Sequence, residues 1–310
     1  MTHVAVSGIV SVRLTRPVET FPVPRTPGQV CDGALGAHLA GAGWTVATTL
    51  RALGADVTFA TYVGADPLGL VAAHGLRARG WYGRATARCA EQPRSVNLYD
   101  NAGVSCGLSD LRGAWDLRYP AELFGALLDD KPADAVLLSS IGFTRPLIDV
   151  TLDRGLPMAT DMQCVIDADY PRKQDWLRAA TIVNCSHEKL RAGPLGWIES
   201  LWRRFGTPVA VVGCGADGTL VGLHDSRQVW HVAAAPPRGV RFTGGAGDTL
   251  LAAFVHCFLD LGDPVASARF AALAAGWFVG GGPAEEFTLS AAELSDLSIR
   301  CGLPTVRRVR

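Results

Sequence analysis

The sequence predicts a three-layer α/β fold, in which helices cover both faces of a mostly parallel sheet. Short apolar segments typical of buried strands alternate with helical patterns along most of the chain. The 310 residues are 48% hydrophobic and 19% charged, which is enough to bury a sizeable core. Two segments of short alternating patterns, roughly residues 11–39 and 93–118, interrupt this rhythm. We therefore expect one domain over residues 1–310, with these two segments forming a small β lid.

In the N-terminal half, glycine and proline mark the ends of the elements. Glycines begin and end a helix over residues 40–54. Asp66, followed by Pro67, is a good N-cap for a second helix that ends near residue 80. Alternation over residues 94–108 predicts two lid strands around a turn at 100–103. The other strands expected in this half cover residues 4–9 and 57–63.

In the C-terminal half, strands alternate with helices up to a hairpin, and helices follow it. Ligands of such sheets bind beyond the carboxyl ends of the strands, and Asp161, Glu188 and Gly215 fall at or just past these ends. The basic run at residues 307–310 is expected to be a solvated tail. The expected strands cover 135–138, 157–161, 181–183 and 209–212, the hairpin 219–223 and 229–232, and the helices 249–261, 264–279 and 291–297.

The composition argues against several classes of function. The 29 lysines and arginines balance 29 aspartates and glutamates, so there is no basic surface for nucleic acid. The sequence shows no apolar stretch of 18 or more residues and no signal-peptide pattern, so we expect no membrane partner. The eight cysteines form no C-x-x-C pair, and several lie in apolar runs. Free thiols in a reducing cytoplasm fit this pattern better than disulfides or a zinc site.

Residues 242–248 (FTGGAGD) are the strongest candidate for the chemistry. Three glycines at a loop-to-helix junction let backbone N–H groups converge at the positive end of the helix dipole, where phosphate binds well. Asp248 lies in the first turn of that helix, where it would act as a base beside the anion. A glycine-rich turn with a capping aspartate would explain the same residues without a ligand. The position of the motif at a sheet edge favours the phosphate site.

Three runs of residues resemble the ribokinase (PfkB) family of sugar and nucleoside kinases. Residues 244–249 (GGAGDT) are similar to the C-terminal G-A-G-D signature of that family. Residues 53–57 (LGADV) and 63–69 (VGADPLG) together resemble a second motif, and residues 211–218 (VVGCGADG) a nucleotide-binding strand and turn. The resemblance covers nearly the whole chain, with the motifs in the family's order. It implies a ribokinase-like core of three layers with a small β lid.

The resemblance also implies the reaction, which is transfer of the γ-phosphoryl group of Mg-ATP to a hydroxyl of a sugar, sugar acid or nucleoside. Asp248 would be the general base. The backbone N–H groups of Gly245, Ala246 and Gly247 would stabilise the charge of the transferred group. Glu188 and Asp161 are expected to act on Mg²⁺ through water, with capping of the next loop as the alternative for Asp161. The residues expected at the nucleotide are Gly213, Gly215, Gly218, Thr243, Gly244 and Ala272.

Several positions depart from the family pattern. Phe242 replaces an aspartate often tied to a monovalent-cation site, which argues against potassium activation. Cys185 stands at the asparagine position of the family's N-x-x-E motif, with Asn184 one residue earlier. Arg13 replaces an aspartate that grips sugar hydroxyls in many members; a guanidinium accepts no hydrogen bonds but pairs well with carboxylate or phosphate. A solvent-facing lid residue is the alternative for Arg13. The residues expected at the substrate are Arg13, Gly41 and Thr45.

Two other functions are kept as alternatives. A protein that keeps the fold but only binds sugars or nucleosides fits the altered substrate loop, although the intact run at 244–248 argues against it. A nicotinamide- or methyl-donor-dependent Rossmann enzyme would need a glycine-rich turn after the first strand, which residues 6–11 lack. Exposed strand edges of a lid favour pairing with a second copy, so a homodimer through the lid is also expected.

Overall fold

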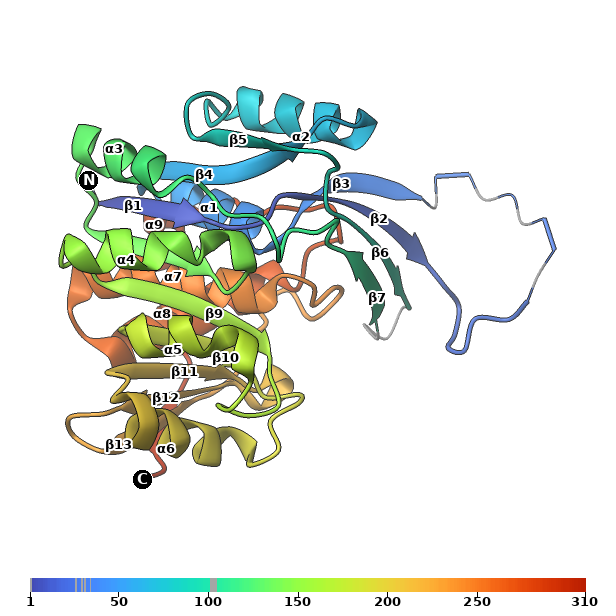
Figure 1. Cartoon of the computed structure of the whole chain (residues 1–310). Helices are drawn as coiled ribbons and strands as arrows, with labels where there is room; N and C mark the ends of the chain where they lie inside the picture. The colour runs from blue at the N-terminus through green and yellow to red at the C-terminus, as the bar shows by residue number, and fades with distance from the viewer. Residues whose placement is uncertain (1, 26, 29, 31, 34, 101–104) are drawn as a thin grey trace.

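The computed structural model of this protein describes residues 2–25, 27–28, 30, 32–33, 35–100 and 105–310. Within these residues a ten-stranded sheet forms the centre, in the order β14-β13-β12-β11-β10-β9-β8-β1-β4-β5 (Figure 1). Neighbouring strands from β11 to β5 are parallel, whereas β12, β13 and β14 pair antiparallel. The strands are β1 (His3–Ser7), β4 (Asp56–Gly64), β5 (Thr86–Cys89), β8 (Ala135–Ser139), β9 (Met158–Cys164), β10 (Ile182–Ser186), β11 (Val209–Gly213), β12 (Thr219–Leu223), β13 (Gln228–Val232) and β14 (Val306–Arg308).

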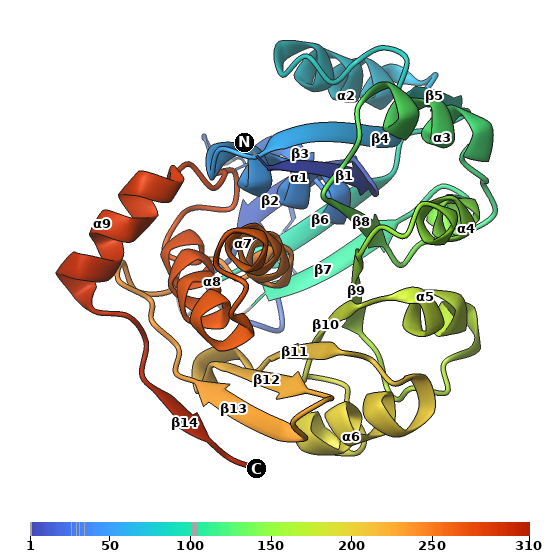
Figure 2. The ribbon, with the colours of Figure 1, turned by 90° about the vertical axis from the view of Figure 1, so that its left-hand side faces the viewer.

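Helices cover both faces of this sheet, and Figure 2 shows α7, α8 and α9 on one side and α4, α5 and α6 on the other. Successive residues of β8 belong to different apolar clusters, Leu137 to one and Val136 to the other, because side chains alternate along a strand. The predicted three-layer fold is therefore confirmed. No helix of the described residues is long and apolar enough to cross a membrane. The helices are α1 (Ala42–Ala52), α2 (Pro67–Ala78), α3 (Ala121–Asp130), α4 (Pro146–Asp153), α5 (Gln174–Ala179), α6 (Gly193–Phe205), α7 (Ala246–Leu261), α8 (Pro264–Phe278) and α9 (Ala291–Cys301), with short 3₁₀ turns η1 (Gly142–Thr144), η2 (Pro171–Lys173) and η3 (Gly215–Asp217).

A second sheet projects beyond the end of the core to which β1 points (Figure 1). Its described strands follow the order β3-β2-β6-β7, with β2 and β6 parallel and the other pairs antiparallel. These strands come from the two segments expected to form a lid. The turn expected at 100–103 extends into residues 101–103, which lie outside the described residues. The strands are β2 (Ser11–Pro17), β3 (Gly36–Ala40), β6 (Arg94–Tyr99) and β7 (Ser105–Asp110).

Asp66 connects the second sheet to the core. Its carboxylate caps α2 by accepting from the backbone N–H of Gly69 at 3.0 Å, with Pro67 in the first turn, so the predicted N-cap is confirmed. The same carboxylate accepts from the N–H of Gln92 at 3.1 Å and pairs with Arg94 at 2.5 Å. One side chain therefore fixes both the start of α2 and the start of β6.

The basic C-terminal run is not a solvated tail, and that prediction is wrong. Residues 306–308 form β14, which pairs antiparallel with β13. The pairing is extended by hydrogen bonds from Val309 N–H to the Val229 carbonyl at 2.8 Å and from Val229 N–H to the Arg310 carbonyl at 3.1 Å. The arginine side chains explain the error, because those of Arg307 and Arg308 are exposed to solvent while the backbone pairs with β13.

Deleting residues 305–310 is expected to lower the free energy of unfolding by about 2–4 kcal/mol, since several backbone hydrogen bonds of about 1 kcal/mol each disappear. It also exposes the edge of β13. Thermal unfolding measures the effect. The control carries Arg307→Gln and Arg308→Gln, which removes the charges and keeps the strand. A deletion variant with the melting temperature of the intact chain would contradict the role given to β14.

Candidate active site

The site is built at the N-terminus of α7. Gly245 is the N-cap, with φ 103°, a conformation that glycine adopts without strain. The backbone N–H groups of Gly245, Gly247 and Asp248 form no hydrogen bond within the described residues, as expected for the first turn of a helix. The N–H of Ala246 differs, because it donates to the Thr243 carbonyl at 3.1 Å. Ala246 therefore closes the turn through its N–H, and its expected place among the anion-binding donors stays a prediction.

Asp248 lies in the first turn of α7, as predicted, and is partly buried. The pKa of Asp248 is raised to about 8, first by desolvation and then by the charge of Asp161, while the charge of Arg13 opposes the rise. A carboxylate with such a raised pKa, beside free N–H donors, combines a base with an anion site. The arrangement matches what proton transfer coupled to charge development requires.

Asp161 lies within β9 and Asn184 within the neighbouring strand β10. They pair in register, and both are almost fully buried. A Cβ built on Gly247 would lie 3.8 Å from Asp161 Oδ2 and 3.9 Å from Asn184 Nδ2, so both side chains reach the start of α7. Asn184 donates to the Gly247 carbonyl at 3.4 Å, while its buried Oδ1 has no partner within the described residues. Desolvation raises the pKa of Asp161.

These oxygens suit a hydrated Mg²⁺, which prefers oxygen ligands and keeps several waters. Glu188 follows β10 and is exposed; its Oε2 accepts from Cys164 Sγ at 3.4 Å. Cys185, expected at the asparagine position of the motif, is buried in the core instead. In the described part of the chain no cluster of three or more histidine, cysteine, aspartate or glutamate side chains could hold a metal by itself. Any Mg²⁺ bound here would depend on phosphate and water for most of its ligands.

The glycines expected at the nucleotide form a tight turn after β11. Gly215 and Gly218 have φ of 59° and 90°, and a Cβ on Gly218 would lie 2.1 Å from the Val232 carbonyl oxygen. The turn is closed by the Cys214 N–H, which donates to the Gly218 carbonyl at 2.7 Å. Gly213, at the end of β11, faces Leu250 of α7, since a Cβ there would lie 3.7 Å from Leu250 Cδ2. Turn geometry thus accounts for Gly215 and Gly218, and nucleotide binding stays a prediction.

The remaining residues expected at the nucleotide differ in accessibility. Thr243 is exposed, and Gly244 lies beside both the Phe242 ring and the Arg13 guanidinium. Ala272 lies in α8 with 6% of its surface exposed, packed into the larger apolar cluster. Thr243 and Gly244 therefore belong to the mouth of the site, whereas Ala272 has little surface to offer a ligand.

The residues expected at the substrate lie on the side of Gly245 that faces the four-stranded sheet and α1. Arg13, Thr45 and Gly244 line one pocket between the four-stranded sheet and α1. A Cβ on Gly245 would lie 3.5 Å from Thr45 Cγ2. Gly41 is the N-cap of α1, with φ 104°, and a Cβ there would meet the Ile9 carbonyl at 2.6 Å, so its role is to let the chain turn.

Phe242 and Arg13, two departures from the family pattern, are in contact. The Arg13 guanidinium carbon lies 6.0 Å from the centre of the Phe242 ring, within cation–π range. Phe242 is 2% exposed and packs edge-on against Tyr99 of β6 at 5.7 Å. The phenylalanine therefore fills its position with a ring that supports the arginine and contacts the second sheet.

Two residues of the pocket region were missed at the level of sequence, His38 on β3 and Ser95 on β6. Each is the direct cross-strand neighbour of Arg13. Alternation along both strands could have placed them on the face of Arg13, but the pairing register depends on long-range contacts that the sequence does not reveal.

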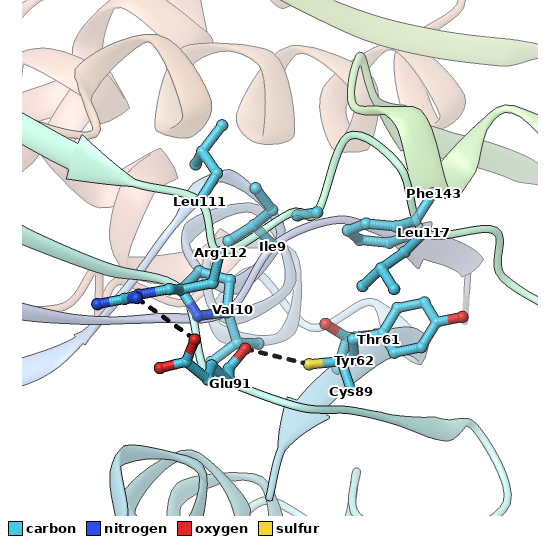
Figure 3. Close-up of a pocket in the computed structure, with 12 residues that line it drawn as sticks. Ile9, Val10, Thr61, Tyr62, Cys89, Glu91, Leu111, Arg112, Leu117 and Phe143 are labelled. Carbon is cyan, nitrogen blue, oxygen red and sulfur yellow. Dashed lines mark hydrogen bonds and ion pairs between the residues drawn. The ribbon is translucent and has the colours of Figure 1, made fainter. Parts of the chain in front are cut away.

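A separate cavity at the base of the second sheet carries none of the predicted site residues (Figure 3). Its walls are mostly apolar, with Ile9, Leu111 and Phe143 among them. Its charged rim is already paired, since Arg112 donates to Glu91 at 3.3 Å. We therefore assign the candidate site to the start of α7.

Comparison with known proteins agrees with this fold. The profile of the pfkB family carbohydrate kinases matches residues 159–286, and no curated protein matches the chain. The microbiome-derived acarbose kinase Mak1 is 23% identical, with a TM-score of 0.85 over 96% of this chain and 99% of that one. The ribokinase of Giardia lamblia is 18% identical, with a TM-score of 0.77 over 96% and 100%. The ribokinase of Arabidopsis thaliana, solved with ribose and ATP, is 19% identical, with a TM-score of 0.75 over 96% and 99%.

These solved structures share the ribokinase-like fold, and the matching segment holds the residues assembled at the site. Residues 159–286 contain Asp161, Asn184 and the run at 244–248. Residues 159–286 thus resemble the pfkB family of carbohydrate kinases, and the whole chain has the fold of these solved structures.

Proposed function

We propose that this protein transfers the γ-phosphoryl group of Mg-ATP to a hydroxyl, expected to be a primary alcohol, of a sugar, sugar acid or nucleoside. The observation that carries the proposal is the placing of Asp248, with its raised pKa, beside the free N–H groups of Gly245 and Gly247. The match of residues 159–286 to the pfkB family supports it, as do solved structures of the same fold that include a ribokinase with ribose and ATP and a nucleoside kinase with inosine.

The residues of the site have separate roles in the proposed reaction. Asp248 accepts the proton of the attacking hydroxyl. The N–H groups of Gly245, Gly247 and Asp248, at the positive end of α7, stabilise charge on the transferred phosphoryl group. Thr45 and Arg13 bind the acceptor on the side facing the second sheet. When bound, Mg²⁺ neutralises charge on the donor phosphates.

The nucleotide is proposed to lie against the turn after β11 and the start of α7. Gly213, Gly215 and Gly218 belong to that turn, and the exposed Thr243 lies just before the start of α7. Asp161 and Asn184 would hold water around the metal, with Glu188 at the outer edge. Residues 11–39 and 93–118 act as a lid over the acceptor.

The activity is expected to depend on pH with a midpoint far above that of an ordinary aspartate. Because the pKa of Asp248 is raised to about 8, kcat/KM for the acceptor should fall about tenfold for each pH unit below that value. Arg13 lowers this pKa, so Arg13→Gln should move the midpoint upward. Initial rates of ADP release across the neutral range measure it. A profile that stays flat down to the acidic range would contradict a base of this kind.

The proposal is tested by a coupled assay of ADP release with Mg-ATP against nucleosides, hexoses, pentoses and sugar acids. Turnover of at least one acceptor, lost in Asp248→Asn, supports it. Binding of sugars or nucleosides without any response to Mg-ATP would instead support a protein that keeps the fold and not the turnover. Binding of ATP without turnover of any of these acceptors would overturn the proposed kinase activity.

A further inference from the structure

A row of polar side chains crosses the inner face of the four-stranded sheet. His38 on β3, Arg13 on β2 and Ser95 on β6 are direct cross-strand neighbours. Because they share one position across neighbouring strands, they lie on the same face. This face is turned to the candidate site, since the Arg13 guanidinium lies beside Gly244 and acts electrostatically on Asp248.

The polar atoms of this row lack partners. Nε of Arg13, both ring nitrogens of His38 and Oγ of Ser95 are buried without a hydrogen bond to any described residue. Buried polar groups are nearly always satisfied in folded proteins, and each exception calls for an explanation. A ligand that supplies several acceptors to one small region would satisfy Arg13 Nε, Ser95 Oγ and the single N–H of a neutral His38 ring.

The pocket also holds a positive charge that nearby carboxylates do not neutralise. Glu285 and Glu286 line the same pocket but are engaged elsewhere: Glu285 pairs with Arg238 at 2.8 Å, and Glu286 with Arg79 at 2.5 Å. Arg13 makes no ion pair with a described residue, although Asp248 acts on it electrostatically. The Phe242 ring supports one side of the guanidinium without occupying its N–H groups.

We propose that the row His38–Arg13–Ser95 binds an acidic group of the acceptor, a carboxylate or a phosphate, so that the substrate is a sugar acid or a sugar phosphate. The inference rests on the proposed function and narrows its acceptor class. The planar fork of Arg13 matches two oxygens of such a group. Ser95 donates through its hydroxyl, and neutral His38 donates through one ring N–H.

The position of Arg13 fits this role for a second reason. An acidic acceptor brings a negative charge close to Asp248, and repulsion would oppose binding. Arg13 interacts with Asp248 and would also interact with the acidic group, which offsets that repulsion. Burial and the guanidinium lower the pKa of His38 to about 4, so in the free protein the imidazole is neutral and does not repel Arg13.

Binding is measured by calorimetry with Mg²⁺ and an ATP analogue that cannot transfer its phosphoryl group. Aldonic acids, uronic acids and sugar phosphates are each compared with the neutral sugar of the same carbon skeleton. At least one acid is expected to bind about 10–100-fold more tightly than its neutral counterpart, as charge-assisted hydrogen bonds allow. Comparison of the carboxylic acids with the sugar phosphates identifies which acidic group the pocket binds. If no acid of either kind is preferred, the inference is wrong.

Three variants separate the role of Arg13 from a general effect of charge. Arg13→Gln is expected to abolish the preference for the acid, and Arg13→Lys to restore part of it. Arg16→Gln removes a positive charge from the opposite face of the same strand and should keep the preference. Equal loss of turnover with acidic and neutral acceptors in Arg13→Gln would overturn the inference, because Arg13 would then serve the transferred phosphoryl group.

Failure of the inference and failure of the proposed function look different. The binding comparison does not require turnover, so it decides the acidic group by itself. Absence of ADP release with acceptors that bind would contradict the kinase activity. Turnover of neutral acceptors without preference for acids would leave the kinase activity standing and remove the acidic acceptor.

Discussion

Replacing Asp248 by asparagine is expected to lower kcat for phosphoryl transfer by about 10²–10⁴-fold, because asparagine cannot accept the proton of the attacking hydroxyl. The binding of Mg-ATP should persist, since the backbone donors of Gly245 and Gly247 are unchanged. Single-turnover measurements of phosphoryl transfer at saturating Mg-ATP and acceptor separate the chemical step from binding.

The same substitution is expected to leave the fold as stable as before, or more stable. The raised pKa of Asp248 means that the folded state keeps a proton which the unfolded state releases at lower pH. The stability that this proton gives is fully present below the unfolded pKa and is lost as pH rises through about 8. A neutral asparagine avoids that loss. The melting temperature of the Asp248→Asn variant should therefore exceed that of the unaltered protein at mildly alkaline pH.

The matched control is Asp260→Asn, which removes a carboxylate from the exposed last turn of the same helix. It should keep full activity. Equal activity of Asp248→Asn and the unaltered chain would exclude Asp248 as the general base. A large drop in stability of Asp248→Asn would instead show that the carboxylate has a structural role.

Gly245→Ala is expected to lower kcat by about 10²–10³-fold, the usual effect of losing one donor that stabilises developing charge. Gly245 has φ 103°, which alanine adopts only with strain, so the turn should shift and misalign its N–H groups. The added Cβ would also lie 3.3 Å from the Phe278 ring, which is a tight contact. Steady-state kinetics with Mg-ATP measure the loss.

A control at the other end of α7 separates activity from strain. Gly262 also has positive φ, 68°, and a Cβ there meets nothing within 4 Å. Both variants should lose about 1–2 kcal/mol of stability, the cost of a left-handed residue with a side chain. Gly262→Ala should nevertheless keep its activity. A Gly245→Ala variant with normal kcat would remove this turn from the anion site.

The sequence was most informative where chemistry depends on local structure. The N-cap at Asp66 and the position of Asp248 in a first helical turn follow from residue types only a few positions apart. The same holds for the glycine at 245, because a helix that starts at a glycine-rich turn leaves its first N–H groups free. The family motifs added the order in which these pieces follow each other.

Local residue patterns did not predict the contacts between distant strands. The sequence marked Arg13 as a departure, but it did not show that His38 and Ser95 flank it across two strand pairs. It also did not show that Phe242 supports Arg13, or that the Ala246 N–H is already used within the turn. The C-terminal run looked solvated, because its charges hide a backbone that pairs with β13.

The sequence by itself determined the fold class, since this depends on periodicity and on short motifs. From the same patterns it also proposed where the site lies and that Asp248 is its base. The tertiary structure alone decided which side chains share the pocket, which polar atoms are left without partners and which charge is left unneutralised. The physical reason is that strand register and the packing of α7 against β9 and β10 are set by apolar burial across the whole sheet, and no local pattern records them.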